Sequence, residues 1–457
     1  MTTPSPSVAA QSLLVNERTS DGRVRVAALC ISSSLRNDCV AYVNHSPGVA
    51  SVVEGEESDA AAWARLLNSL KTPITVIPRN ALDLDPMPLP AVSAEALAQS
   101  PAPIVGKSFA RVGIMGNPSD GFFGKTISLL IKNFDATVTL SPNSSPSELT
   151  IRIDPSPVLD PYLFASMPTL RVACEKDGYY GIHRLILATL HLFARTCAHE
   201  NINLDTRRGF RVSYATNIPR QVGLAGSSAM VTALLRALLH YYALESHAAF
   251  PLHARADLAW RVEKEELGIA SGLQDRVVQA YGGLMYMDFG REWMEARGYG
   301  VYECLPVEWT PKGLWIAYVG APSDSGKIHS DVRARFFAGD EEVVKAMSHF
   351  ADLATQAREA LQRGDSRKFA ELMEDNFSTR RSVYGDAVVG ATNLAVVKVA
   401  REFGHAAKFS GSGGCVVGLW RGEEGMESVE GRREMVRRIR GFGYVFEEVV
   451  VASEEEA

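Results

Sequence analysis

The sequence lacks a long hydrophobic run, an excess of positive charge and a patterned set of cysteines. No apolar stretch reaches the roughly 18 to 20 residues that a membrane-spanning helix needs, so we expect no transmembrane segment. Lys and Arg number 47 against 53 Asp and Glu, and the resulting net charge of −6 argues against nucleic acid as the main partner. The cysteines form no CxxC pair, which favours reduced thiols in a cytoplasmic protein. They are Cys30, Cys39, Cys174, Cys197, Cys304 and Cys415.

The first hundred residues differ in character from the rest of the chain. Arg23, Asp38 and Thr72 each begin a strand-like segment, and residues 60–70 have the pattern of a short helix. A proline-rich stretch follows at 83–103 and predicts a linker. We therefore expect a small α/β appendage whose role the sequence does not reveal, preceded by a disordered tail rather than a targeting segment.

From Lys107 onward, strand and helix patterns alternate and predict an α+β protein of more than one domain, as the length of 457 residues also suggests. Phe109–Met115 and Thr126–Leu140 read as strands, the second folding back on itself near 132–135. Further strands are expected at 210–214, 284–289, 302–307, 314–319, 407–409, 415–420 and 444–451. Helices are expected at 182–198, 252–267, 274–280, 332–337, 341–363, 367–383, 388–403 and 427–439.

A glycine- and serine-rich turn opens into an apolar helix in the stretch IPRQVGLAGSSAMVTALLRALL, residues 218–239. Gly223 and Gly226 permit backbone conformations that other residues avoid, and Ser227 and Ser228 fall where a new helix offers free N–H groups. Such a helix start attracts anions, so the turn predicts a phosphate cradle. The alternative is an ordinary capped helix. The predicted cradle comprises Gly223, Leu224, Ala225, Gly226, Ser227, Ser228 and Ala229.

PRQVGLAGSSA resembles the central motif of the GHMP small-molecule kinases, and two flanking segments resemble the other motifs of that family in the same order. These are KSFARVGIMGNPSDGFFGKTIS at 107–128 and AAKFSGSGGCVVGLW at 406–420. Within the family, the sequences of these motifs are most similar to those of plant-type glucuronokinases. The resemblance extends over about residues 107–452.

The resemblance implies a two-lobed fold and a kinase activity. It implies an appendage at 1–100, a ribosomal-protein-like N-terminal ATP-binding domain at 107–300 and a ferredoxin-like C-terminal domain at 301–452. It also implies that ATP and Mg²⁺ are used to phosphorylate the anomeric hydroxyl of a sugar acid, most simply glucuronate for UDP-glucuronate salvage, in a cytoplasmic monomer or homodimer. Alternatives are a kinase for galacturonate, arabinose or a heptose, or a sensor that binds sugar and nucleotide without catalysis.

The resemblance also implies roles for individual residues. Ser228 and Glu263 match the metal ligands, and Glu263 stands twelve positions before Asp275, as in the galactokinase-like pattern. Asp275 matches the aspartate that approaches the acceptor hydroxyl, either as a base or as an orienting group. Arg111 matches the basic residue that pairs with this aspartate. Without the resemblance, the segment EKEE at 263–266 would be interpreted as a charged helix face exposed to solvent, and Asp275 as a helix cap.

The substrate contacts are expected from the first and third motifs and from a later helix. Asp120 can accept two sugar hydroxyls, although an Asp-Gly turn is the alternative. A sugar carboxylate favours an arginine fork, and the candidates are Arg380, its neighbour Arg381 and Lys327. The residues predicted to contact the sugar acid are Asn117, Asp120, Arg380, Ser412 and Gly413.

Overall fold

The computed structural model describes most of the chain after the appendage. The described residues are 102–453, except 146, 155–162, 178, 180–182, 205–208, 270, 321–328 and 422–427, together with six short strands in the first hundred residues. The chain divides into two compact units, one formed by Met1–Ser100 with Arg152–Leu163 and the other by Pro101–Ile151 with Phe164–Ala457.

The described strands of the first hundred residues form two small antiparallel sheets. One has the order β2-β3-β4-β6, and the other pairs β1 with β5. Segments predicted from Arg23, Asp38 and Thr72 are confirmed as β3, β4 and β6, whereas the predicted helix at 60–70 lies outside the described residues. The bounds are β1 Gln11–Leu13, β2 Glu17–Arg18, β3 Arg23–Ala27, β4 Cys39–Asn44, β5 Ala50–Val52 and β6 Ile74–Pro78.

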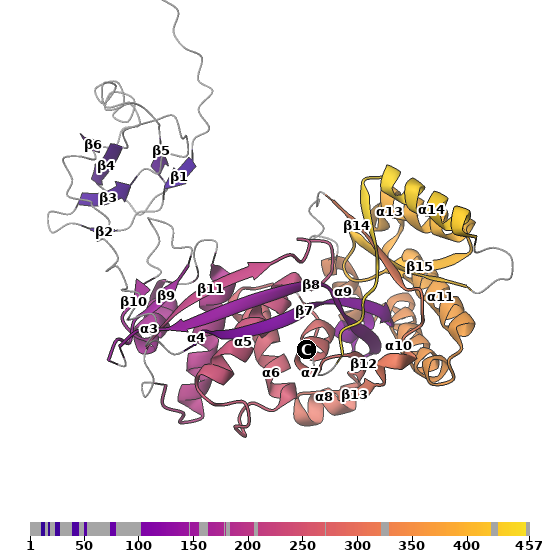
Figure 1. The fold of residues 1–457 in the computed structure, drawn as a ribbon, viewed down its shortest axis with the longest axis horizontal. Coiled ribbons are helices and arrows are strands. Elements are labelled where there is room, and N and C mark those ends of the chain that lie inside the picture. Colours follow the sequence, from indigo (N-terminus) through magenta and orange to yellow (C-terminus); the bar gives the residue numbers. More distant parts are fainter. Residues whose placement is uncertain are drawn as a thin grey trace, which may run out of the picture. The chain divides into compact units, whose positions relative to one another are not determined.

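The large sheet of the second unit is built around one long strand. β8 pairs with β7, β11 and β12, and the sheet continues in the order β10-β9-β11-β8-β12-β13 (Figure 1). Apolar residues of β7 and β8 are almost all buried, which is why two strands of this length remain extended. The bounds are β7 Ile104–Met115, β8 Lys125–Pro142, β9 Ile151–Ile153, β10 Leu163–Phe164, β11 Phe210–Thr216, β12 Leu284–Asp288 and β13 Val301–Leu305.

The prediction that the second strand folds back near 132–135 is wrong. β8 continues without interruption, and its pairing with β7 shifts between Phe109 and Ala110 at this point. The polar residue Asn133 donates to the carbonyl of Glu448 at 2.8 Å and accepts from the N–H of Val450 at 2.9 Å. The polar residue Asn133 therefore makes a contact with residues 448–450 and does not form a turn.

Helices pack on the large sheet and bring two of the predicted motifs together. α5 contacts β7 and β8, and α7 contacts both strands as well (Figure 1). The apolar side chains of α5 are buried, as the helical spacing predicts, and they include Val231, Leu234 and Leu238. The bounds are α3 Met167–Asp177, α4 Arg184–His199, α5 Gly226–Tyr241, α6 Leu252–Arg261, α7 Gln274–Tyr281 and α8 Arg291–Arg297, with a π-helix η4 at Val262–Glu266 and a 3-10 turn η3 at Ser119–Phe122.

A second, four-stranded antiparallel sheet has the order β15-β16-β14-β17. Its core includes Trp315, Phe377 and Phe409. β13, expected to open this lobe, instead pairs with β12 in the large sheet. No helix among the described residues is both long and apolar enough to cross a membrane. The bounds are β14 Trp315–Val319, α9 His329–Phe337, α10 Glu341–Gln362, α11 Ser366–Tyr384, α12 Asp386–Val389, α13 Ala391–Glu402, β15 His405–Phe409, β16 Cys415–Trp420, α14 Val429–Gly441 and β17 Tyr444–Glu448, with a 3-10 turn η5 at Val307–Trp309.

Candidate active site

The predicted phosphate cradle leads into the N-terminus of α5 through a loop of alternating left-handed residues. Gln221, Gly223 and Ala225 have φ values of 58°, 77° and 62°, and no side chain caps the helix start. Left-handed residues separated by ordinary ones turn backbone N–H groups toward one side, as in anion-binding nests. The sequence predicts unusual backbone conformations at Gly223 and Gly226. The structure has a left-handed residue at Gly223, but the next one is Ala225 and not Gly226. A non-glycine residue costs free energy there, which is typical of functional loops.

The third glycine motif packs against this cradle backbone to backbone. A Cβ atom added to Gly411 would lie 2.4 Å from the carbonyl oxygen of Gly223. A Cβ on Gly223 would in turn lie 3.0 Å from the nitrogen of Ser412 and 3.1 Å from the oxygen of Gly413. Only glycine permits this approach. Ser412 and Gly413 therefore lie beside the cradle, and their contact with substrate stays a prediction.

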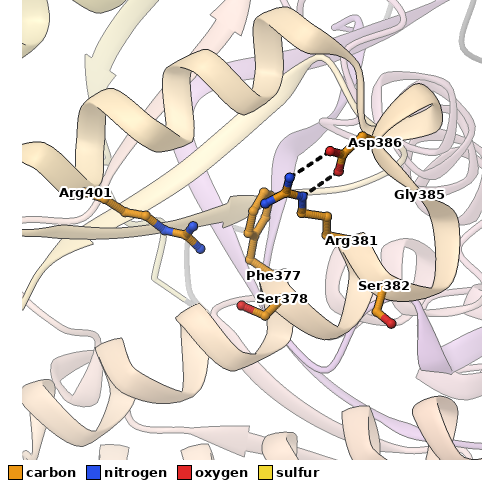
Figure 2. A pocket seen from close by; sticks show the side chains of 7 residues that line it. All are labelled: Phe377, Ser378, Arg381, Ser382, Gly385, Asp386 and Arg401. Atoms are coloured by element: carbon orange, nitrogen blue, oxygen red, sulfur yellow. Dashed lines mark hydrogen bonds and ion pairs between the residues drawn. The ribbon is translucent and has the colours of Figure 1, made fainter.

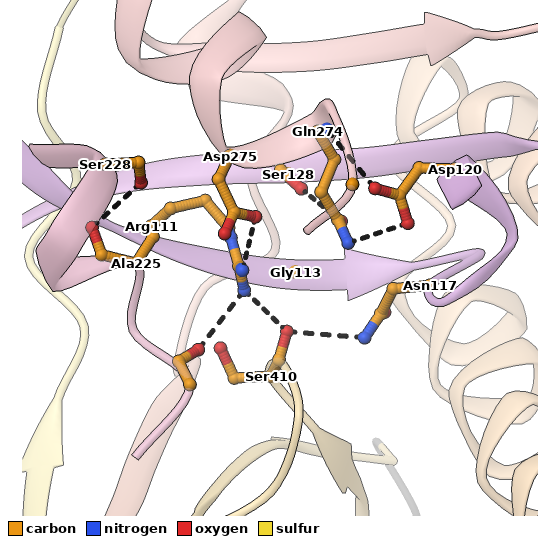
Figure 3. A network of polar contacts seen from close by, with 12 residues as sticks. Arg111, Gly113, Asn117, Asp120, Ser128, Ala225, Ser228, Gln274, Asp275 and Ser410 are labelled. Atoms are coloured by element: carbon orange, nitrogen blue, oxygen red, sulfur yellow. Dashed lines mark hydrogen bonds and ion pairs between the residues drawn. The ribbon is translucent and has the colours of Figure 1, made fainter. Parts of the chain in front are cut away.

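Arg111 and Asp275 form an ion pair at the centre of the site (Figure 3). Arg111, on β7, is 4% exposed. Its other terminal nitrogen donates to the carbonyl oxygens of Ser410 at 2.8 Å and Gly223 at 3.3 Å. Asp275 lies in the first turn of α7, where the N-cap residue is Leu273, so it does not cap the helix. The arginine fixes the aspartate in relation to both glycine loops.

A buried lysine ties the first motif to the third. The side-chain nitrogen of Lys408 lies within hydrogen-bonding distance of the carbonyl oxygens of Gly113 at 3.1 Å and Phe409 at 2.9 Å and of the side-chain oxygen of Asn117. The Asn117 amide then donates to the carbonyl of Ser410 at 3.3 Å (Figure 3). Asn117 is 1% exposed, so its side chain is engaged within the protein, and its predicted contact with substrate is not supported by these bonds.

Glu263 is the glutamate of EKEE that pairs with Arg276, the residue next to Asp275. It is fully buried in η4, whereas the Glu265 side chain is 45% exposed. Glu263 pairs with Arg276, and Arg276 also lies 3.3 Å from Asp275. Glu266 instead pairs with Arg195 at 2.6 Å. The π-helix gives these three glutamates different environments, which a charged-face reading does not predict.

Asp120 lies in η3 beside the start of α7. It accepts hydrogen bonds from the backbone nitrogen of Gln274 at 3.3 Å and from its side-chain nitrogen at 3.1 Å. Burial raises the pKa of Asp120 from 3.8 to about 6, and the negative charge of Asp275 adds to this effect. A partly buried carboxylate close to Arg111 and Asp275 can accept hydrogen bonds from hydroxyl groups, and its contact with a sugar stays a prediction.

The structure distinguishes between the three candidates for the carboxylate-binding cation. Arg381 is exposed and holds Asp386 through two bonds of 2.5 and 2.7 Å, beside a shallow hollow at the end of α11 that contains no residue of the three motifs (Figure 2). Arg380 is 4% exposed and lies against the rings of Tyr384 and Phe409, with no carboxylate partner among the described residues. Lys327 lies outside the described residues. Of the two arginines, Arg380 is therefore the one whose charge is not already paired with a described carboxylate.

The residues predicted to hold Mg²⁺ have suitable oxygen atoms. One carboxylate oxygen of Glu263, Oε1, is buried and has no hydrogen-bond partner, and the hydroxyl of Ser228 donates to the carbonyl of Ala225 at 3.1 Å, which leaves its lone pairs free. Carboxylate and hydroxyl oxygens are hard ligands, as Mg²⁺ requires. The donor set fits the ion.

Two residues of the site were missed by sequence reasoning in part or in full. Arg276 directly follows Asp275 in the sequence, and its bridge between Glu263 and Asp275 depends on η4, which no sequence pattern marks. Lys408 was quoted within the third motif without a role. A single lysine in an otherwise apolar strand, AAKF, was the one signal that could have drawn attention to it.

Comparison with known proteins agrees with this geometry. Residues 184–283 match the family described as GHMP kinases N terminal domain, and residues 357–432 match GHMP kinases C terminal. The first range contains the phosphate cradle, Glu263 and Asp275. The second contains Arg380 and the third glycine motif.

Individual relatives extend the similarity to most of the chain. The chain is 44% identical to probable glucuronokinase 2 of Arabidopsis thaliana over 73% of its own length and 88% of the relative's. It is also 44% identical to glucuronokinase 1 of the same plant, over 70% of its own length and 85% of the relative's. Among solved structures, galactokinase of Lactococcus lactis in complex with galactose is similar in fold, with a TM-score of 0.58, 17% identity and coverage of 79% of this chain and 96% of that one.

Proposed function

The chain belongs to the GHMP kinase family, and we propose that it transfers the γ-phosphoryl group of ATP to the anomeric hydroxyl of D-glucuronate. The products are glucuronate 1-phosphate and ADP. In the transfer, the acceptor oxygen forms a bond to the γ-phosphorus, the bond to the β-phosphate oxygen breaks, and the hydroxyl proton leaves to Asp275 or to solvent.

The nucleotide end of the site is assigned to the cradle at Gly223–Ala229. Its left-handed residues and the uncapped start of α5 favour the binding of phosphate oxygens. Ser228 and Glu263 are the residues that would hold Mg²⁺. When bound, this ion supplies positive charge that offsets the charge of the triphosphate.

The acceptor end is assigned to three charged residues. Asp275 is held by Arg111 and would orient the attacking hydroxyl or accept its proton. Asp120 accepts hydrogen bonds from further hydroxyl groups of the sugar. Arg380 binds the sugar carboxylate through its planar fork.

The observation that carries the choice of a sugar acid is the state of Arg380. A buried guanidinium without a carboxylate partner is costly, and burial lowers the pKa of Arg380. An anionic ligand would remove this cost. The ring of Tyr384 lies against Arg380. Burial raises the pKa of the Tyr384 hydroxyl, the positive charge of Arg380 lowers it, and the negative charge of Asp120 raises it. A pyranose that carries both a carboxylate and vicinal hydroxyls suits such a pair of neighbours.

The cellular setting follows from the reaction and from the composition. We place the protein in the cytoplasm, where glucuronate 1-phosphate would enter UDP-glucuronate synthesis. It would act there as a monomer or homodimer.

A coupled ADP-release assay over glucuronate, galacturonate, glucose and arabinose tests the proposal, with phosphorus NMR to locate the phosphate on the sugar. We expect glucuronate to be preferred and to be phosphorylated at the anomeric position. Arg380→Met should lower kcat/KM for glucuronate by about 10- to 100-fold, as for the loss of charge-assisted hydrogen bonds, and leave the slow reaction with glucose unchanged.

Arg381→Met is the matched control, because this neighbouring arginine is exposed and paired with Asp386. It should retain the wild-type preference. Equal activity on glucose and glucuronate in the wild type would overturn the assignment of substrate, and an equal effect of the two substitutions would overturn the role of Arg380.

A further inference from the structure

Arg276 lies between the two carboxylates to which the proposed function gives different tasks. One terminal nitrogen, Nη2, pairs with Oε2 of Glu263. The other, Nη1, lies 3.3 Å from Oδ2 of Asp275 and donates to the carbonyl of Gly272 at 2.9 Å. Arg276 is 3% exposed. One guanidinium thus joins the predicted metal ligand to the predicted catalytic aspartate.

The charges around Arg276 depend strongly on one another. Burial acts against its positive charge, but the carboxylates of Glu263 and Asp275 outweigh burial and raise the pKa of Arg276. The arginine therefore stays charged at any physiological pH. Glu263 has no other cationic partner among the described residues, so removal of Arg276 would leave a fully buried carboxylate without a counter-charge.

Two buried atoms of this pair have no hydrogen-bond partner, namely Oε1 of Glu263 and Nε of Arg276. Native proteins rarely leave such atoms unsatisfied, and an absent ion is a common reason. Oε1 is the atom of Glu263 that remains free to bind a cation. A cation that binds there would meet the positive charge of Arg276 on the same carboxylate, and like charges at such separations repel strongly in a buried site.

We propose that Arg276 is a positioning residue that competes with the divalent cation for Glu263 while it fixes Asp275, so that the metal binds together with ATP and not alone. The inference rests on the kinase activity proposed above. The negative triphosphate adds the charge that lets a second cation share Glu263 with Arg276. Asp275 meanwhile has one oxygen on Arg111 and the other beside Arg276, which fixes its orientation.

The test measures metal binding without any sugar. Mn²⁺, a paramagnetic substitute for Mg²⁺, is titrated into the wild type by electron paramagnetic resonance, alone and with a non-hydrolysable ATP analogue. We expect weak binding of Mn²⁺ alone and binding at least about tenfold tighter with the nucleotide, since removal or offset of one unit charge at this range is worth at least that factor. Tight binding of Mn²⁺ alone that is lost in Glu263→Gln would overturn the inference.

Arg276→Gln should have the opposite metal behaviour. Its melting temperature should fall without metal because Glu263 loses its counter-charge, and Mg²⁺ alone should restore much of the loss, whereas Mg²⁺ alone should leave the wild type unchanged. The double variant with Glu263→Gln should lose this response, because the carboxylate itself is gone. A melting temperature of Arg276→Gln that does not respond to Mg²⁺ would overturn the competition.

The kinetic readout separates positioning from general stability. Arg276→Lys keeps one positive charge for Glu263 but cannot reach both carboxylates, so we expect the wild-type response to Mg²⁺ together with a kcat lowered by about tenfold or more at nearly unchanged KM for ATP. Full kcat in this variant would exclude a positioning role. If a sugar other than glucuronate is the one phosphorylated while the metal responses are as expected, the proposed substrate fails and the inference on Arg276 stands.

Discussion

Asp120 should lower the stability of the protein at neutral pH, and its replacement by asparagine should reveal this. Burial and the nearby Asp275 raise its pKa from 3.8 to about 6. Between these values the folded protein keeps a proton that the unfolded chain has lost, so the free energy of unfolding falls as the pH rises through this window. Above pH 6 the full loss persists. Asparagine stays neutral at every pH, so the Asp120→Asn variant does not lose this free energy of unfolding.

The magnitude follows from the shift. A change from 3.8 to about 6 is about two pH units, and at 1.36 kcal/mol per unit it corresponds to at most about 3 kcal/mol. Solvent screening at this partly exposed side chain lowers the figure, so we expect Asp120→Asn to gain about 1 to 3 kcal/mol at pH 7.5 and at most about 0.5 kcal/mol at pH 4. In the variant, the side-chain amide of Gln274 can rotate by half a turn. Its oxygen then accepts a hydrogen bond from the new amide at position 120, and its nitrogen donates to the hydroxyl of Ser128, which lies 3.2 Å from the Gln274 oxygen in the wild type.

Chemical unfolding at pH 4 and pH 7.5 measures both values. Asp386→Asn is the control, because a hydrogen bond from Arg381 lowers the pKa of Asp386, and the ionised form is therefore favoured on folding. This control should gain nothing at pH 7.5. The reasoning is refuted if Asp120→Asn is less stable than the wild type at pH 7.5, or if its gain at pH 4 equals its gain at pH 7.5.

The same substitution should impair the proposed reaction while it stabilises the fold. The loss of charge-assisted hydrogen bonds to sugar hydroxyls should raise KM for the sugar by about 10- to 100-fold. The wild-type kcat/KM should fall with acid near pH 6, as Asp120 becomes protonated, and the variant should lack this limb. A trade of stability for binding is common at sites selected for function.

Two further predictions address the catalytic pair and its support. Asp275→Asn should lower kcat by about 100-fold or more with ATP affinity nearly intact, as measured by steady-state kinetics and nucleotide titration, and turnover within about threefold of wild type would exclude its role. Burial and the charges of Arg380 and Arg111 hold the pKa of Lys408 well below its usual value of 10.5. Between the lowered and the usual pKa the unfolded chain binds a proton that the folded protein lacks, so the free energy of unfolding should rise with pH as the pH approaches 10.5. Lys408→Met should flatten this rise in thermal unfolding at several pH values, and an equally steep rise in both proteins would contradict it.

The parts of the site that the sequence predicts are those held by local chemistry. Glycines and serines before an apolar run predict a tight turn into a helix, and the structure has left-handed residues at Gly223 and Ala225 followed by α5 from Gly226. The strands and most helices follow from apolar periodicity. The pairing of Arg111 with Asp275 came from the resemblance to a family and not from spacing.

The parts that the sequence does not predict depend on contacts between distant residues. Asn133 looked like part of a turn because its partners, Glu448 and Val450, lie more than 300 positions away. The contact of Asn117 with Lys408 could not be predicted because the two residues are 291 positions apart. Glu263 is buried through a π-helix whose extra residue has no sequence signature.

The bond from Arg111 to the carbonyl of Ser410 spans 299 positions of the chain, and this separation gives the protein an order of maturation during synthesis. Domains form from the N-terminus as the ribosome proceeds. The predicted phosphate cradle and Asp275 are made before Ser410 and Lys408, which hold Arg111 and the first motif in place. A nascent chain, or one shortened by a premature stop codon before Lys408, would carry the residues proposed to bind nucleotide without the contacts that hold Arg111 beside Asp275. The transfer activity proposed above would thus require that synthesis has passed Ser410.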